Sequence, residues 1–223
     1  MTVTLDMQDS VAVITIDDGK KNAITHDILG RLEQALDTAE AEAGAVVLAG
    51  RPGSFCAGFD LATMTGSDPE AARALGGRGG ALAVRLFGFP KPLVAACTGH
   101  AFTIGAIWLA CCDTRIGEEG PFKFGMRETV LGMVLPDWAV LPLKERLSQA
   151  HFLAAVTQSQ TFDPQGAREA GFLDRLVPAG RAVAQACALA AELAQLPGDA
   201  YAGNKLSTRG DVLDRMRASL SAR

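Results

Sequence analysis

Several features that mark particular classes of protein are scarce or missing in this chain of 223 residues. It has three histidines, and nowhere do His, Cys, Asp and Glu gather at metal-ligand spacing, so we expect no metal site. No stretch approaches the ~20 apolar residues needed to span a bilayer. The N-terminus has neither the basic start nor the apolar run of a signal peptide. We therefore expect a cytoplasmic protein that does not contact membranes.

Disulfide, nucleic-acid and dinucleotide signatures are missing as well. The five cysteines include no CxxC pair, and the adjacent Cys111 and Cys112 lie in apolar sequence, where thiols usually behave as small core side chains. The net charge is −4 and the basic residues are dispersed, so we expect no nucleic-acid partner. No G-x-G-x-x-G follows the first expected strand, which argues against a dinucleotide-binding domain.

What the chain does have is an alternation of strand and helix patterns. The runs at 11–16 and 45–50 are β-branched or continuously apolar, and the second has the character of a strand buried on both faces. Between them, Thr25 can cap a helix whose apolar positions recur at helical spacing. A strand opened by two prolines follows at 89–99. This order predicts the α/β class with mostly parallel strand pairing.

The glycine-rich stretch from Ser67 to Arg85 is interpreted as helix fragments, and as mobile. This expectation depends on Gly76, Gly77, Gly79 and Gly80, because glycine weakens the interior of a helix. Further helices are expected at Trp138–Leu147, Gln149–Val156, Pro164–Ala170, 181–196 and 204–221.

Three motifs then agree in order and spacing with a known family. SFCAGFDL occupies 54–61, KPLVAACTGHAFTIGAIWLACCDTRI occupies 91–116, and FKFGMRETVLGMVLP occupies 122–136. Together with AREAGFLDRLVP at 167–178, they resemble the crotonase superfamily, the enoyl-CoA hydratase/isomerase family of acyl-CoA enzymes. The resemblance covers most of the chain.

The resemblance implies both an architecture and a substrate. We expect a crotonase-like ββα spiral, with a core at 1–180 and a helical segment at 181–223 that covers the site or mediates trimer formation. The family suggests a homotrimer or a dimer of trimers. An acyl-CoA thioester is the expected substrate, with coenzyme A entering only as part of it and no separate cofactor.

By motif position, the resemblance also implies an oxyanion hole. The backbone N–H groups of Phe59 and Ile104 are the expected donors to the thioester oxygen, and each such donor contributes roughly 3–4 kcal/mol to the stabilisation of a developing oxyanion. Coenzyme A is expected to contact the backbone around Ala23 and Ala57.

Lys20, Lys21 and Asp60 complete the set expected at the coenzyme A end. The two lysines would lie near phosphate, although they are equally well interpreted as ordinary turn residues. Asp60 is expected mainly to anchor its loop.

The catalytic acids that the resemblance implies are incomplete. Family hydratases use two glutamates; the first position is held here by Ile107, and the second by Glu128. One carboxylate suits a Δ3,Δ2-enoyl-CoA isomerase, in which a single group removes a proton at C2 and returns one at C4. A hydratase or another crotonase reaction, and an acyl-CoA-binding homologue without catalysis, remain alternatives.

The acyl pocket is expected to be apolar and dry, so that the abstracted proton is not lost. Ile107, Trp108, Phe59 and Trp138 are its expected walls, and Asp137 is a second acid that related enzymes could recruit. The competing interpretation of Glu128 is an exposed turn carboxylate paired with the neighbouring Arg127. Asp113 is expected to satisfy backbone groups behind the site.

Overall fold

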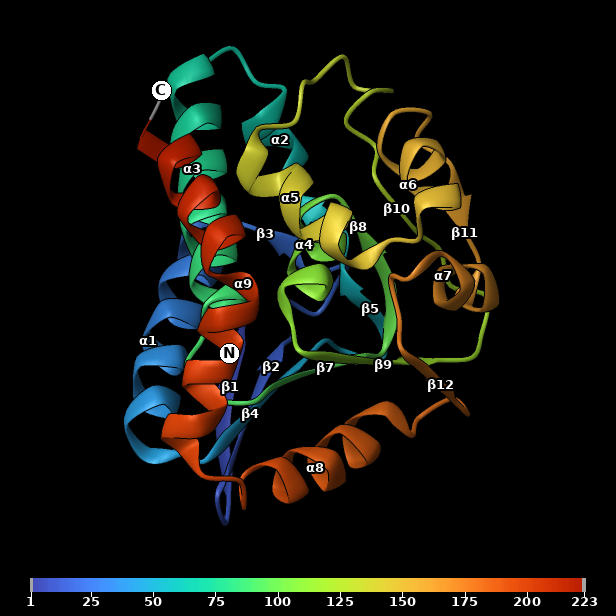
Figure 1. Ribbon diagram of the computed structural model, residues 1–223. Coiled ribbons are helices and arrows are strands. Elements are labelled where there is room, and N and C mark those ends of the chain that lie inside the picture. Colours follow the sequence, from blue (N-terminus) through green and yellow to red (C-terminus); the bar gives the residue numbers. More distant parts are fainter. Residues whose placement is uncertain (1, 222–223) are drawn as a thin grey trace.

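A six-stranded sheet runs through the centre of the protein in the computed structural model, which describes residues 2–221 (Figure 1). Its strands are, in spatial order, β1 (Val3–Gln8), β2 (Val11–Ile16), β4 (Ala45–Ala49), β7 (Leu93–Cys97), β9 (Thr114–Glu118) and β12 (Arg175–Val177). The β1–β2 pair is antiparallel and every other neighbouring pair is parallel. The α/β class with mostly parallel pairing is therefore confirmed.

The central strands are covered on both faces, which explains their continuous apolar sequence. Alternate residues of a strand point to opposite faces, so Val46 and Leu48 join the core beneath helix α1 (His26–Glu42), whereas Val47 joins the layer beneath helix α8 (Ala182–Leu193). Thr25 caps α1 as predicted, because its side-chain oxygen accepts a hydrogen bond from the N–H of Ile28 at 3.3 Å.

Two smaller sheets lie above the central one. The larger consists of β11 (Thr161–Phe162), β10 (Phe124–Gly125), β8 (Gly99–Phe102) and β5 (Gly53–Cys56), in that spatial order. The smaller pairs β3 (Ala23–Ile24) with β6 (Gly58–Phe59) in parallel. These short strands bring the three sequence motifs together, because β6, β8 and β10 carry one segment of each.

The remaining helices surround these sheets (Figure 1). They are α2 (Leu61–Met64), α3 (Pro69–Phe87), α4 (Ile104–Cys111), α5 (Asp137–Arg146), α6 (Gln149–Val156), α7 (Pro164–Ala170) and α9 (Gly198–Ser221). Helix α9 packs along α3 and α5, and α8 completes the core on the second face of the central sheet. Of the helices described between residues 2 and 221, none is both long and apolar enough to cross a membrane.

The glycine-rich stretch is a single continuous helix, α3, so the prediction of broken fragments is wrong. Two of its glycines are required by close packing. A Cβ at Gly79 would lie 2.5 Å from ring atoms of Phe59, and a Cβ at Gly80 would lie 2.6 Å from the indole of Trp138. Tertiary contacts therefore outweigh the low intrinsic helix propensity, which sequence patterns alone cannot reveal.

Substitutions within α3 are expected to separate the effect of close packing on stability from the effect of intrinsic helix propensity. Gly80→Ala should destabilise the protein by about 1–3 kcal/mol, because the added methyl group overlaps the Trp138 ring. Gly77→Ala is the matched control: apart from its own turns of α3, no atom of residues 2–221 lies within 4 Å of its Cβ position, so it should stabilise the protein by about 0.5–1 kcal/mol. Urea unfolding of both variants measures the difference, and equal shifts would contradict the packing argument.

Candidate functional site

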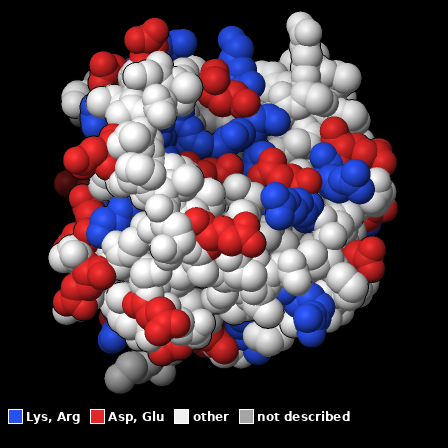
Figure 2. Space-filling model, turned by 60° about the horizontal axis from the view of Figure 1, so that its bottom comes forward, with Lys and Arg blue, Asp and Glu red and all other residues white. Residues whose placement is uncertain are grey.

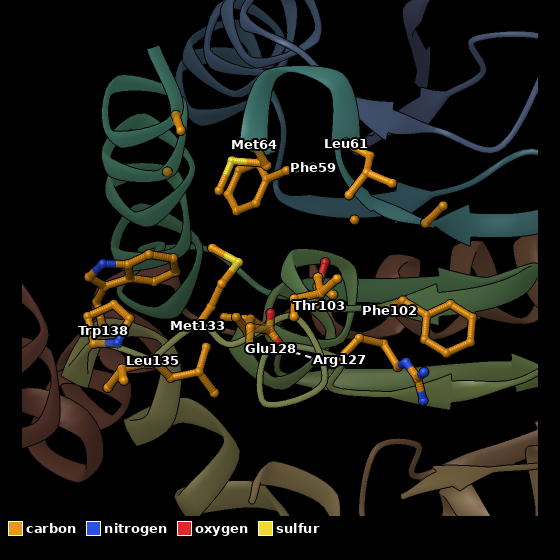
Figure 3. A pocket seen from close by; sticks show the side chains of 18 of the residues that line it. Phe59, Leu61, Met64, Phe102, Thr103, Arg127, Glu128, Met133, Leu135 and Trp138 are labelled. Carbon is orange, nitrogen blue, oxygen red and sulfur yellow. Dashed lines mark hydrogen bonds between the residues drawn. The ribbon is translucent and has the colours of Figure 1, made fainter. Parts of the chain in front are cut away.

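A cavity of about 550 Å³ opens where the three sequence motifs meet. The loop after β5, helices α2 and α3, the start of α4 and the segment 127–136 all contribute to it (Figure 3). Most of its wall is apolar. The lining residues are Ala57, Gly58, Phe59, Leu61, Met64, Ala72, Arg73, Gly76, Phe102, Thr103, Ile107, Arg127, Glu128, Leu131, Met133, Val134, Leu135, Pro136, Trp138 and Thr161.

Glu128 lies in the turn after β10 and reaches the cavity (Figure 3). It is only 8% exposed, and its Oε2 accepts a hydrogen bond from the N–H of Arg127 at 2.8 Å. Burial raises the pKa of Glu128 above its usual value, and the backbone N–H groups of residues 127 and 128 oppose part of that rise. The Arg127 guanidinium points away in Figure 3. The alternative of an exposed carboxylate paired with Arg127 is therefore wrong.

The raised pKa has a consequence for stability that can be measured. Because the folded state favours protonated Glu128, stability should fall as pH rises from about the ordinary value of 4.5 through the higher folded-state pKa. Glu128→Gln lacks this titration. We expect the stability of the variant relative to the wild type to rise across that interval and to stay at the higher level at pH 7. Chemical unfolding at a series of pH values tests this, and a difference that does not change with pH would contradict it.

Ile107 stands where family hydratases carry their first glutamate, and it lines the same cavity. It is 1% exposed on α4. Phe59 and Met64 lie on the side of the cavity opposite Glu128, while Trp138 lies at one end (Figure 3). Glu128 is the one carboxylate among the described lining residues. The site therefore combines a single acid with a largely apolar wall.

Two residues expected in the acyl pocket do not line the cavity. Trp108 is fully buried in the core, with its Nε1 3.5 Å from the carbonyl oxygen of Gly79. Asp137 is 60% exposed at the start of α5, with its carboxylate 3.6 Å from Arg215. Successive residues of a helix point about 100° apart, so the neighbours of lining residues Ile107 and Trp138 face elsewhere. The expectations for Trp108 and Asp137 as pocket residues are corrected accordingly.

The two expected oxyanion donors lie on elements that meet at the cavity. Phe59 ends strand β6 and lines the cavity directly. Ile104 is the first residue of α4, so its N–H has no acceptor within the helix and lies at the positive end of the helix dipole. The N–H of Ile107 completes the first turn by donating to Thr103 at 3.0 Å. The oxyanion-hole role of Phe59 and Ile104 stays a prediction.

Thr103 is a cavity residue that the sequence analysis did not single out. Its φ of 50° is in the left-handed region, which is rare for a β-branched residue. Its buried Oγ1 has no hydrogen-bond partner among the described residues. A Cβ at Gly58 would lie 2.3 Å from that oxygen, so only glycine fits there. Strained backbone and an unpaired buried hydroxyl are typical of functional sites, but no sequence pattern marks either.

The segments expected to contact coenzyme A are hydrogen-bonded to each other. Ala23 pairs with Gly58 across β3 and β6, and the N–H of Ala57 donates to the carbonyl of Lys21 at 3.1 Å. The side chains of Lys20 and Lys21 are exposed on the preceding turn. This places the predicted backbone contacts side by side, with two flexible cations beside them.

Asp60 and Asn22 hold these segments in place. Asp60 caps α2 by accepting hydrogen bonds from the N–H and Oγ1 of Thr63, at 2.9 and 2.8 Å. It thus anchors its loop as expected. Asn22, which the sequence analysis missed, is fully buried at φ 58° and donates from Nδ2 to the carbonyls of Ile16, Ser54 and Phe55. Asparagine tolerates this backbone region better than most residues, which is the one signal available from sequence.

Comparisons with known proteins agree with this geometry. The family model for "Enoyl-CoA hydratase/isomerase" matches residues 6–222. A crystal structure of an enoyl-CoA hydratase/isomerase family protein from Pseudomonas syringae has a TM-score of 0.95 and 37% identity, covering 99% of this chain and 95% of that one. Two structures of one Mycobacterium tuberculosis protein, described once as an enoyl-CoA isomerase and once as a probable enoyl-CoA hydratase, have TM-scores of 0.93 and 0.95 and 35% identity. Each covers 99% of this chain, and they are covered to 96% and 94%. A putative enoyl-CoA hydratase from Thermus thermophilus is 32% identical over 193 residues, covering 83% of this chain and 75% of that protein.

Proposed function

This chain belongs to the enoyl-CoA hydratase/isomerase family of the crotonase superfamily, and we propose that it moves the double bond of an enoyl-CoA from C3 to C2. Glu128 is the proposed acid and base. The observation that carries the proposal is that Glu128 is the one carboxylate among the described lining residues, in a largely apolar cavity with isoleucine at the other acidic position of the family's hydratases.

The proposed reaction is a proton transfer in two steps with no net change in composition. The Glu128 carboxylate removes a proton from C2, and the electron pair moves toward the thioester carbonyl to form a dienolate. The N–H groups of Phe59 and Ile104 would donate to the oxygen on which negative charge develops. The Glu128 carboxylic acid then returns a proton to C4, which leaves the double bond between C2 and C3, conjugated with the thioester.

The environment of Glu128 favours this reaction over the addition of water. Burial raises the pKa of Glu128, so its carboxylate takes up a proton more readily than an exposed carboxylate does, as a group that removes a proton and returns it requires. Hydration needs a second acidic group to position water, and the side chain of Ile107 has no polar atom with which to do so. The apolar wall formed by Phe59, Met64 and Trp138 limits loss of the abstracted proton to solvent.

Product analysis separates the candidate activities. Purified protein is incubated separately with 3-enoyl-CoA and with 2-enoyl-CoA, each in a short-chain and a long-chain form, and the products are identified by chromatography and mass spectrometry. We expect 3-enoyl-CoA to become the conjugated isomer and 2-enoyl-CoA to gain no water. Rapid hydration of 2-enoyl-CoA would contradict the isomerase proposal, as would binding of both thioesters with conversion of neither.

A further inference from the structure

A second cavity, of about 420 Å³, lies beyond the C-terminal end of helix α4, whereas the N-terminal end of α4 faces the first cavity. It is formed between the first half of α9 with the two residues that precede it, Asp113 in the segment between α4 and β9, and the last residue of α5. It shares no lining residue with the acyl-CoA cavity. In Figure 2, Lys and Arg side chains gather in a hollow of the surface, with Asp and Glu side chains beside them. No part of the proposed isomerase reaction uses this cavity.

The charges lining the second cavity are unbalanced. Arg146, Lys205 and Arg209 contribute three positive charges, whereas Asp113 is the one carboxylate among the described lining residues. Asp113 forms ion pairs with Lys205 at 2.6 Å and Arg209 at 3.1 Å. The described residues provide no carboxylate within ion-pair distance of Arg146. The lining therefore carries about two positive charges in excess.

The two arginines keep hydrogen-bond donors free beside this charge. Arg146 donates from Nε to Ala110 at 3.3 Å and from Nη2 to Cys112 at 2.8 Å, which leaves Nη1 without a partner among the described residues. Arg209 donates only from Nη1 to described residues, which leaves Nε and Nη2. Burial lowers the pKa of Arg146 to about 10; the nearby Arg115 and Arg209 add to that effect, and the carboxylates of Asp174 and Asp113 oppose part of it. A bound anion would relieve this repulsion.

Lys205 holds the cavity wall in place. Its ammonium group donates to Asp113 and to the carbonyls of Phe89 and Lys91, so its donors are already used. The amide of Asn204 lies on the exposed rim one residue earlier. The free donors are thus the planar forks of two arginines, which suit the oxygens of phosphate or carboxylate groups.

We propose that this second cavity binds a phosphate group, either as free inorganic phosphate or as part of a small phosphorylated metabolite. Phosphate is favoured over a single carboxylate because its charge of about −1.5 to −2 at pH 7 matches the excess on the lining. Leu196, Pro197 and Ala200 form an apolar border on which the remainder of a metabolite would rest.

The test uses two probes, inorganic phosphate and AMP, and one pair of variants at the rim. Asn204→Glu adds a carboxylate at an exposed position without removing a packing contact, and Asn204→Gln is the matched neutral control. Binding is measured by ³¹P NMR line broadening and by the shift in Tm, at constant ionic strength maintained with chloride. We expect phosphate to bind at millimolar concentrations, and Asn204→Glu to weaken that binding about tenfold or more through repulsion of like charges.

The outcomes distinguish the source of the phosphate and decide the proposal. Binding of both probes with similar affinity, weakened by Asn204→Glu and unchanged in Asn204→Gln, supports a site for free phosphate. Tighter binding of AMP with the same dependence on the variants supports a phosphorylated metabolite. Absence of binding for both probes overturns the proposal. Binding that Asn204→Glu does not alter also overturns it, because the probe then occupies another site such as that for coenzyme A.

Discussion

Replacing Glu128 with glutamine is expected to lower kcat for the conversion of 3-enoyl-CoA by about 10²–10⁴-fold, the usual contribution of a positioned acid–base group. The amide has nearly the same shape as the carboxylate, and its oxygen can still accept the hydrogen bond from the N–H of Arg127. It cannot accept a proton from carbon. Affinity for the substrate should therefore change little, since the loss falls on the transition state.

Steady-state kinetics and a direct binding measurement separate these effects. Asp137→Asn is the matched control, because this nearby carboxylate is 60% exposed and lies outside the cavity; its kcat should equal that of the wild type. If Glu128→Gln retained most of its activity, Glu128 would not be the acid–base group. If Asp137→Asn lost as much, the exposed acid would need a role that its position does not explain.

Replacing Asp113 with asparagine is expected to cause the largest loss of stability, about 3–5 kcal/mol, because it leaves buried cations without their anion. Asp113 joins elements that are far apart in sequence. Its oxygens accept from Leu93 at the start of β7, from Tyr201 on α9, and from Lys205, which is 8% exposed. Its interpretation as a group that satisfies backbone donors behind the site is confirmed by the Leu93 contact, and the ion pairs extend that role.

Urea unfolding in a phosphate-free buffer measures this loss. Asp214→Asn provides the matched control, since Asp214 pairs with Arg217 at 3.0 Å on the surface, where both side chains are more than half exposed. Such pairs contribute about 0–1 kcal/mol, so the control should unfold close to the wild type. Similar losses of unfolding free energy in the two variants would show that Asp113 contributes little to the stability of the buried cluster.

Local sequence patterns were sufficient to predict the helices and strands whose buried residues recur at regular spacing along the chain. Helix α1 begins after Thr25 and buries Ile28, Leu29, Leu32, Ala35, Leu36 and Ala39, the positions that recur at helical spacing. Strand β4 is buried at every residue, as its continuous apolar run predicted. The C-terminal helix begins at Gly198, earlier than the expected 204, because helix ends carry weaker signals than helix faces.

Helix α3 shows where local patterns fail. Four glycines predict a broken, mobile segment when each residue is considered only with its sequence neighbours. In the folded protein, Gly79 and Gly80 allow α3 to approach Phe59 and Trp138, and contact with those rings stabilises the helix. Thr103 is a second example, because its strain and its unpaired hydroxyl depend on the neighbouring Gly58 and on the turn into α4.

The order of residues by itself determined the α/β class, the family resemblance, and the presence of a single glutamate where hydratases have two. Those properties depend on side-chain identity and spacing, which are present before folding. Only the tertiary structure decided that Glu128 is buried, that Trp108 and Asp137 turn away from the cavity, and that no carboxylate of the described residues lies within ion-pair distance of Arg146. The burial of a side chain, the direction in which it points and the ion pairs it forms depend on distances between segments far apart in the chain. Those distances are fixed only when the chain folds.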